Sequence, residues 1–113
     1  MNQRGAAAEA LAASFLLAHG LVIAHRNYRC RFGEIDLIAR DGTTLVFVEV
    51  RQRRSEAFGG AAESINAAKR ARLVAAARHY LARFRDVSSC RFDVVLIRGD
   101  EPRIEWLRNA FGE

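Results

Sequence analysis

The sequence is short of several features that mark specialised classes of protein. It has one proline and two cysteines in 113 residues, and no Pro- or Ser-rich stretch divides it, so we expect a single domain over residues 1–113. Cys30 and Cys90 have no metal-ligand spacing and follow no secretory signal, which favours two reduced packing residues over a disulfide. The longest apolar stretch, residues 6–18, is interrupted by Glu9 and is too short to span a bilayer. These absences favour a cytoplasmic protein that does not associate with membranes.

Positive charge is what the sequence has in excess. Lysine and arginine outnumber aspartate and glutamate by 18 to 13, which gives a net charge of +5 and a pI near 10.2. A protein this basic attracts phosphate polymers, so we expect a nucleic acid as a partner. The alternative is a basic surface without a partner, because a composition rich in arginine and alanine can also reflect genomic base composition.

Apolar spacing and turn residues predict two helices and five strands. In chain order we expect a helix over Gly5–His19, strands over Leu21–Tyr28, Glu34–Arg40 and Thr44–Arg51, a helix over Ala62–Phe84, and strands over Cys90–Arg98 and Arg103–Leu107. The stripes expected to face the sheet are Ala8, Leu11 or Ala12, Phe15 and Ala18 in the first helix, and Ile65, Leu73, Ala76, Tyr80 and Phe84 in the second. The order α-β-β-β-α-β-β predicts an α/β fold with helices flanking a mixed β-sheet.

The two strands around the turn at Asp41-Gly42-Thr43 carry the most informative acids. If this hairpin pairs so that opposed residue numbers sum to 85, Asp36 faces Glu49. Like charges in opposed positions destabilise a sheet, so their presence needs a reason. A bound Mg²⁺ or Mn²⁺ ion would supply one, because such ions favour carboxylate oxygens. A register slip of two residues would instead place Glu34 opposite Glu49.

A metal ion at this pair would suit the hydrolysis of a phosphodiester, because it can lower the pKa of a bound water that attacks phosphorus. Asp36 and Glu49-Val50-Arg51 resemble the D…(D/E)xK signature of the restriction-endonuclease-like superfamily, with arginine in place of lysine. Arginine stabilises negative charge but stays protonated, so it cannot serve as a general base. Lys69, the one lysine of the chain, lies within the apolar stripe of the second helix and is either its replacement or a snorkelling surface residue.

Other polar residues have weaker claims. Glu9 borders the apolar stripe of the first helix and is either a third metal ligand or a solvated helix glutamate. Asp93 interrupts an apolar strand, where we expect it to be paired and structural. An ordinary ion pair between Glu34 and Arg51 would remove both from the site. The cations expected to contact nucleic acid are Arg29, Arg31, Arg51, Arg53, Lys69 and Arg70.

The chain also resembles one family along nearly its whole length. The stretches that carry the resemblance are Gly5-x-x-x-Glu9-x-x-Ala12, Asn27-Tyr28-Arg29, Gly33-Glu34-Ile35-Asp36-Leu37-Ile38, Val46-Phe47-Val48-Glu49-Val50-Arg51, Phe58-Gly59, Lys69, Arg91-Phe92-Asp93-Val94-Val95 and Asn109-Ala110-Phe111. Together they are similar to the YraN family of small uncharacterised bacterial proteins. The resemblance implies a restriction-endonuclease-like fold, akin to archaeal Holliday-junction resolvases, with Glu9, Asp36 and Glu49 as the metal-binding acids. The family pattern usually has lysine at the position of Arg51.

The sequence therefore predicts a Mg²⁺- or Mn²⁺-dependent endonuclease that acts on DNA, with branched or structured DNA among the candidate substrates. In this interpretation Asp36, Glu49, Arg51 and Lys69 form the catalytic set. The alternative is a catalytically inactive nucleic-acid-binding or accessory protein of the same fold. Whether two chains pair as a homodimer stays open.

Overall fold

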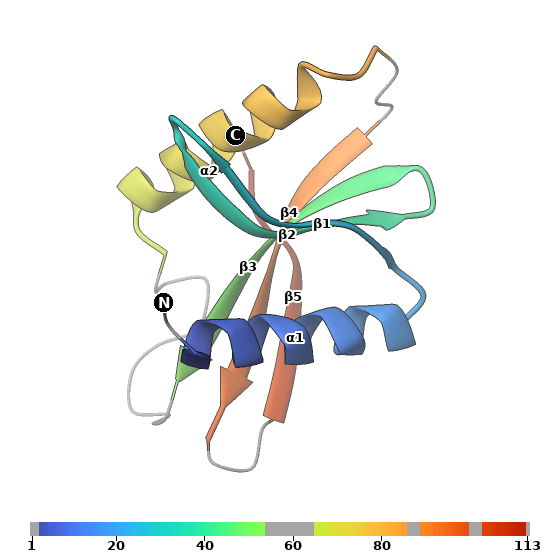
Figure 1. Cartoon of the computed structure of the whole chain (residues 1–113), viewed down its shortest axis with the longest axis vertical. Helices are drawn as coiled ribbons and strands as arrows, with labels where there is room; N and C mark the ends of the chain where they lie inside the picture. The colour runs from blue at the N-terminus through green and yellow to red at the C-terminus, as the bar shows by residue number, and fades with distance from the viewer. Residues whose placement is uncertain (1–2, 54–64, 86–88, 100–102, 113) are drawn as a thin grey trace.

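Two helices and five strands make up the described part of the chain. A computed structural model describes residues 3–53, 65–85, 89–99 and 103–112 (Figure 1). The elements are α1 (Gln3–Ala18), β1 (Val22–Cys30), β2 (Gly33–Asp41), β3 (Thr44–Arg53), α2 (Ala67–Leu81), β4 (Ser89–Arg98) and β5 (Arg103–Phe111). The predicted α/β class and element order are confirmed, and the last strand runs to Phe111 rather than Leu107.

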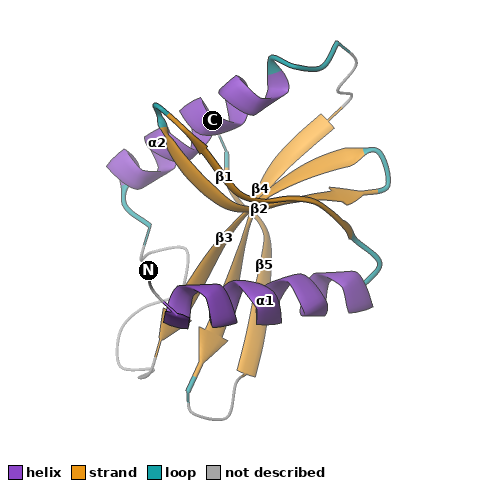
Figure 2. Cartoon of the chain, viewed as in Figure 1, coloured by secondary structure: helices purple, strands orange, loops and turns teal. Residues whose placement is uncertain are grey.

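All five strands belong to one mixed sheet in the order β1-β2-β3-β4-β5. Neighbouring strands are antiparallel except β3 and β4, which run parallel. A parallel pair needs a long crossover connection, and α2 lies within this one. In Figure 2 the twisted strands pass through the centre of the molecule, with α1 on one side of them and α2 on the other. β3 is the central strand, and β1 and β5 are the edge strands.

Each helix covers a separate half of the core. The α2-side cluster includes Tyr28, Ile35, Ile38, Leu45, Phe47, Leu73, Ala76, Tyr80, Val94 and Leu96, and the α1-side cluster includes Ala8, Ala12, Ala13, Leu16, Leu37, Ala39, Val46, Val48, Val95 and Ile97. Successive residues of β3 alternate between the two clusters, as a pleated strand requires. Because both faces of β3 and β4 are covered, these strands have nearly continuous apolar sequences.

The hairpin of β2 and β3 has the register predicted from its turn. Its Cα partners run from Asp41 opposite Thr44 to Leu37 opposite Val48, and the residue numbers of each pair sum to 85. A slip by two residues is therefore wrong for this ladder. Gly42 in the turn has a φ of 62°, a left-handed conformation that glycine adopts without steric cost.

The start of α2 differs from the prediction. The helix begins at Ala67, and its N-cap is Asn66, whose Oδ1 accepts a hydrogen bond from the backbone N–H of Lys69 at 2.8 Å. Asparagine competes well for this position because its side chain satisfies an N–H that has no partner within the helix. Ile65, predicted to be helical, therefore lies before the helix, and residues 62–64 are outside the described residues.

Several apolar residues of the two helices also differ in burial from the prediction. α2 ends at Leu81, so Phe84, predicted to lie against the sheet, is 48% exposed. In α1 the buried member of the pair Leu11 and Ala12 is the alanine, whereas Ala18 at the helix end is exposed. Small residues on the buried side of α1 let its backbone approach the sheet closely.

The cysteines are both free thiols, so the disulfide alternative is wrong. Cys30 packs against the α2-side cluster, as predicted. Cys90 is exposed, which corrects its predicted packing role, because it lies at the beginning of β4, before the buried part of that strand starts at Phe92. Within the described ranges, neither helix has the length and apolar character needed to cross a membrane.

Asp93 anchors β5 to the centre of the sheet. It has no exposed surface, and its carboxylate accepts hydrogen bonds from Arg91 Nε at 3.0 Å, Trp106 Nε1 at 2.9 Å and the Asn109 N–H at 2.9 Å. The β4–β5 register shifts at this point, and Asn109 has a left-handed φ of 51°. The expectation of a paired, structural aspartate is confirmed.

Replacing this aspartate should destabilise the fold strongly. Asp93→Ala leaves the buried donors around it without an acceptor and should lower the free energy of unfolding by about 3–5 kcal/mol. Urea denaturation followed by circular dichroism measures this loss. Glu105→Ala is the control, because it breaks only the exposed ion pair with Arg98 at 3.1 Å and should cost under about 1 kcal/mol. Equal losses for the two variants would contradict the assignment.

Candidate functional site

Asp36 lies where β2 departs from regular pleating. Ile35 and Ile38 both pack in the α2-side cluster, although strict alternation places residues three apart on opposite faces. The β2–β3 ladder ends at Leu37, and one step beyond it Asp36 Oδ2 accepts a hydrogen bond from the Val50 N–H at 2.8 Å. A side chain therefore replaces the main-chain acceptor at this step, which fixes the Asp36 carboxylate against β3.

Two further polar side chains approach Asp36 from β1 and α1. Asn27 falls across from Asp36 in the β1–β2 register and has a left-handed φ of 52°, a conformation that asparagine tolerates better than most residues. Glu9 of α1 is half-buried beside them: burial and the Asp36 charge raise its pKa above 4.5, whereas a hydrogen bond with Asn27 opposes this rise. Glu9 was predicted as a site residue from the sequence, whereas Asn27 was not. An asparagine inside a strand, where it is disfavoured, was the available signal.

Glu49 is the buried acid of the site, with 4% of its surface exposed. It alternates along β3 with the residues of the α1-side cluster and therefore faces α2, like Phe47. Burial and the charge of Asp36 raise the pKa of Glu49 to about 7, against the opposing effects of Lys69 and Arg51. The structure thus brings together the two acids that the hairpin register had placed opposite each other.

Two cations contact the Glu49 carboxylate. Glu49 Oε2 lies 3.4 Å from Lys69 Nζ and 3.6 Å from Arg51 Nε. Both cationic side chains are about one-third exposed, at 31% and 33%, so each also faces solvent. Lys69 therefore does not simply extend its amine into water, because it also forms an ion pair with Glu49. The ion pair of Glu34 is with Arg29, at 3.3 Å, rather than the pair with Arg51 that the sequence left open.

The donor set suits a hard divalent cation. Adjacent carboxylates repel one another, and Mg²⁺ usually binds one or two carboxylates together with waters. Asp36 and Glu49 provide such a pair. Among the described residues, no three His, Cys, Asp or Glu side chains are grouped so as to hold a metal ion, so a shell that includes Glu9 is not preassembled. The residues fit a Mg²⁺ or Mn²⁺ ion held by Asp36 and Glu49. Glu9 lies near Asp36 but does not complete a group of three ligands.

The cations predicted to contact nucleic acid lie in separate places. Arg51 and Lys69 lie beside the acids, and Arg29 and Arg31 lie near the β1–β2 turn. Arg70 of α2 lines a groove that Gly112 also borders. Arg53 ends β3, and its side chain is outside the described residues. Residues 65–85 contain six lysines and arginines and no aspartate or glutamate. The region of α2 is therefore uniformly basic.

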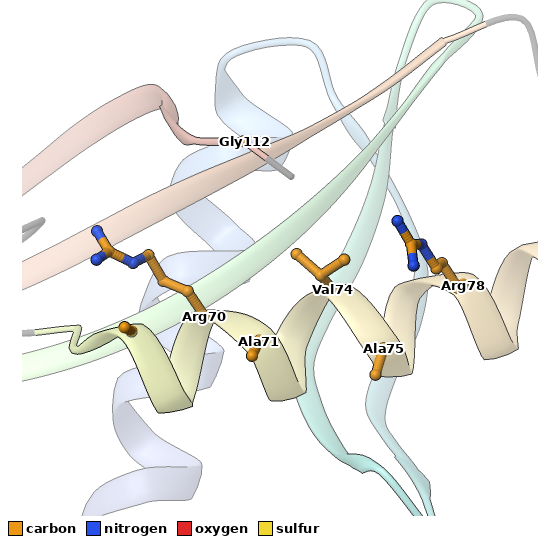
Figure 3. Close-up of a pocket in the computed structure, with 7 residues that line it drawn as sticks. Arg70, Ala71, Val74, Ala75, Arg78 and Gly112 are labelled. Carbon is orange, nitrogen blue, oxygen red and sulfur yellow. The ribbon is translucent and has the colours of Figure 1, made fainter.

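A groove of about 540 Å³ lies along α2 on the side that faces Gly112, just after β5 (Figure 3). Its walls are formed by Ala67, Arg70, Ala71, Val74, Ala75, Arg78 and Gly112. Arg70 and Arg78 are eight residues apart, or about 12 Å along the helix, and small apolar side chains lie between them. No carboxylate side chain is among these residues, so the groove extends the basic surface of α2 and is separate from the acidic pair.

Comparison with known proteins places these residues in a wider context. The model of the uncharacterised protein family UPF0102 matches residues 8–97, a range that contains the acids and Lys69. A UPF0102 protein of Nitrosospira multiformis is 59% identical over 112 residues, which cover 98% of this chain and 94% of that protein. One from Nitrosomonas europaea is 59% identical, covering 99% and 96%, and one from Cupriavidus taiwanensis is 58% identical, covering 96% and 82%.

The buried acid should make stability depend on pH. Because the pKa of Glu49 is about 7 in the folded protein, against an ordinary 4.5, the folded state binds the extra proton between these pH values. The free energy of unfolding should therefore fall as pH rises from about 4.5 to 7, by up to about 3 kcal/mol. Urea denaturation in EDTA at pH 5 and pH 8 measures this fall, which Glu49→Gln should largely abolish. Parallel pH profiles for wild type and variant would contradict it.

Proposed function

This chain belongs to the uncharacterised protein family UPF0102, and we propose that it is a divalent-metal-dependent endonuclease acting on DNA. The observation that carries the proposal is the acidic pair itself: Glu49 is buried beside Asp36 and contacted by two cations. Burying like charges together is costly, and such arrangements are concentrated at functional sites. The fold that the family resemblance implies, restriction-endonuclease-like, agrees with the mixed sheet and its element order.

Each residue of the site has a distinct part in this proposal. Asp36 and Glu49 would hold Mg²⁺ or Mn²⁺, which supplies a Lewis acid and a water of lowered pKa when bound. The hydrogen bond from the Val50 N–H keeps the Asp36 carboxylate in one orientation. Arg51 and Lys69 would neutralise charge that develops on the phosphate, since both side chains are partly exposed next to the acids.

Lys69 adds a second cation beside the acids. Its ammonium is a compact charge with three hydrogen-bond donors, whereas the Arg51 guanidinium is a planar fork. Lys69 reaches the same Glu49 oxygen as Arg51, but from α2 instead of β3. The chain therefore keeps a lysine beside its acids despite the arginine in the hairpin motif.

The surface around the site favours a nucleic acid as substrate. α2 begins beside Glu49, presents only basic charges over residues 65–85 and borders the basic groove. Cations in this arrangement contact phosphates without regard to base sequence. A substrate with closely spaced backbones, such as branched DNA, would meet more of these cations than a single straight duplex.

One observation favours the alternative of binding without cleavage. Both cations of the site contact the acid that would hold metal, so an ion pair network alone could balance the charge of Glu49. In that case the fold would bind DNA through its basic surface and the acids would be structural. Metal binding and cleavage distinguish the two functions.

Metal should stabilise the protein if the acidic pair binds it. At ten times the dissociation constant, Mg²⁺ or Mn²⁺ adds about 1.4 kcal/mol to the stability, which corresponds to an increase in Tm on the order of 5 °C. Differential scanning calorimetry measures this shift. Asp36→Asn should remove it, whereas Glu105→Gln, at an exposed acid outside the site, should retain it. An unchanged wild-type Tm at millimolar metal would argue for the binding function.

Cleavage should depend on both acids. Labelled duplex, single-stranded and four-way-junction DNA are incubated with the protein, with and without Mn²⁺. Asp36→Asn and Glu49→Gln should each slow metal-dependent cleavage by about a hundredfold or more, and Glu34→Gln serves as the matched control at an exposed acid. Cleavage that is equal in wild type and site variants, or absent from all of them, would sink the endonuclease proposal.

A further inference from the structure

We propose that a patch of rings and arginines near the C-terminal end of α2 binds unpaired nucleic-acid bases. This patch, which we call the aromatic patch, consists of Phe32, His79, Phe84, Arg31 and Arg83. The inference rests on the proposed function only in taking nucleic acid as the ligand. It requires neither a metal ion nor cleavage.

The rings of the aromatic patch stand on a buried aromatic support. Tyr28 is 3% exposed, and its hydroxyl forms a hydrogen bond with Nδ1 of His79. The His79 ring lies 6.0 Å from that of Phe32, and the Tyr28 ring lies 5.1 Å from that of Tyr80, which is also buried. These contacts hold the outer rings in place, so a base that stacks on them immobilises few side-chain rotamers.

Guanidinium groups lie next to these rings. The Cζ atom of Arg31 is 4.8 Å from the centroid of Phe32, and the Cζ atom of Arg83 is 5.2 Å from the centroid of Tyr28. A base can stack on a ring or on the flat guanidinium, and the same cation can contact the phosphate that follows. Aromatic faces combined with cations are the arrangement by which proteins hold single strands without base preference.

The exposure of the rings supports a ligand. Phe32 is 38% exposed and Phe84 is 48% exposed, and the Phe84 ring lies 5.3 Å from Tyr80. Single exposed apolar residues are common and need no explanation. In the described ranges, however, both large aromatic residues of this kind fall in the aromatic patch, whereas the aliphatic ones are on α1 and β1, namely Leu11, Leu17 and Val22.

The aromatic patch and the acidic pair lie along the same helix. Ten residues separate Lys69 from His79, or about 15 Å of helix. The β1–β2 turn is packed onto α2 between them, because a Cβ added to Gly33 would lie 3.5 Å from the Cβ of Arg72. A strand with its unpaired bases on the aromatic patch can therefore continue toward the acids. The substrate class that fits is DNA with a single-stranded segment next to a duplex.

Charge favours nucleic acid over a protein partner as the occupant. The aromatic patch carries two arginines, and residues 65–85 contain no acid. A peptide that covered exposed rings in this setting would need acidic groups in place of phosphates. A ligand that fits the aromatic patch offers flat π-systems and negative charges at close spacing. Single-stranded nucleic acid provides both in every nucleotide.

Binding in EDTA tests the inference apart from catalysis. Fluorescence anisotropy compares an oligothymidylate of about 20 nucleotides, an abasic strand of the same length and a duplex. The variants are Phe32→Ala/Phe84→Ala, Phe32→Leu/Phe84→Leu and the matched control Leu11→Ala/Leu17→Ala, which removes equally exposed apolar side chains elsewhere. The leucine variant keeps apolar bulk but removes the π-faces, so it separates loss of the rings from loss of the fold. Circular dichroism checks that each variant is folded.

Wild type should bind the oligothymidylate about 5- to 100-fold more tightly than the abasic strand. Both phenylalanine variants should lose this preference while their affinity for duplex changes less than about twofold, and the control should behave as wild type. A wild type that does not distinguish the two strands, variants that keep the preference, or an equal loss for single strand and duplex would each overturn the inference. Ring-dependent binding without metal-dependent cleavage would support it while refuting the endonuclease proposal.

Discussion

The placement of a buried carboxylate next to a second carboxylate is the constraint around which this molecule is organised. Water is excluded from Glu49, and Asp36 adds a like charge, so the anionic form of Glu49 is disfavoured and its pKa rises to about 7. The protein counters this cost with Lys69, Arg51 and the backbone N–H that holds Asp36. A fold that needed stability alone would place an apolar residue at this position of the sheet.

The sheet topology explains how these groups meet. β3 and β4 run parallel, so the chain must cross over between them, and α2 lies in that crossover. Its first turn lies next to the part of β3 that carries Glu49, because Lys69 contacts that residue. The N-terminal end of a helix also has a partial positive charge, which favours anions nearby. The crossover therefore places the Lys69 cation and the positive end of the α2 dipole next to the acids of the hairpin.

A second consequence of this arrangement is that α2 links two chemically different surfaces. Its beginning faces the acidic pair, whereas its end, through His79 and Tyr80, supports the exposed rings beside the β1–β2 turn. The two proposals made for this member of the UPF0102 family therefore use opposite ends of the same helix, and both take nucleic acid as the ligand. Asp93 is also a buried acid of this sheet, and its carboxylate holds β4 and β5 together.

The sequence by itself determined the element order, the central residues of the sheet-facing stripes and the hairpin register, because these depend on local spacing and on the turn at Gly42. It therefore also determined that Asp36 and Glu49 come together. Only the tertiary structure decided that Lys69 reaches Glu49, that Asn27 and Glu9 approach Asp36, and that Phe32 meets His79. Those contacts join residues on separate elements, and periodicity within one element carries no information about how another element is docked against it.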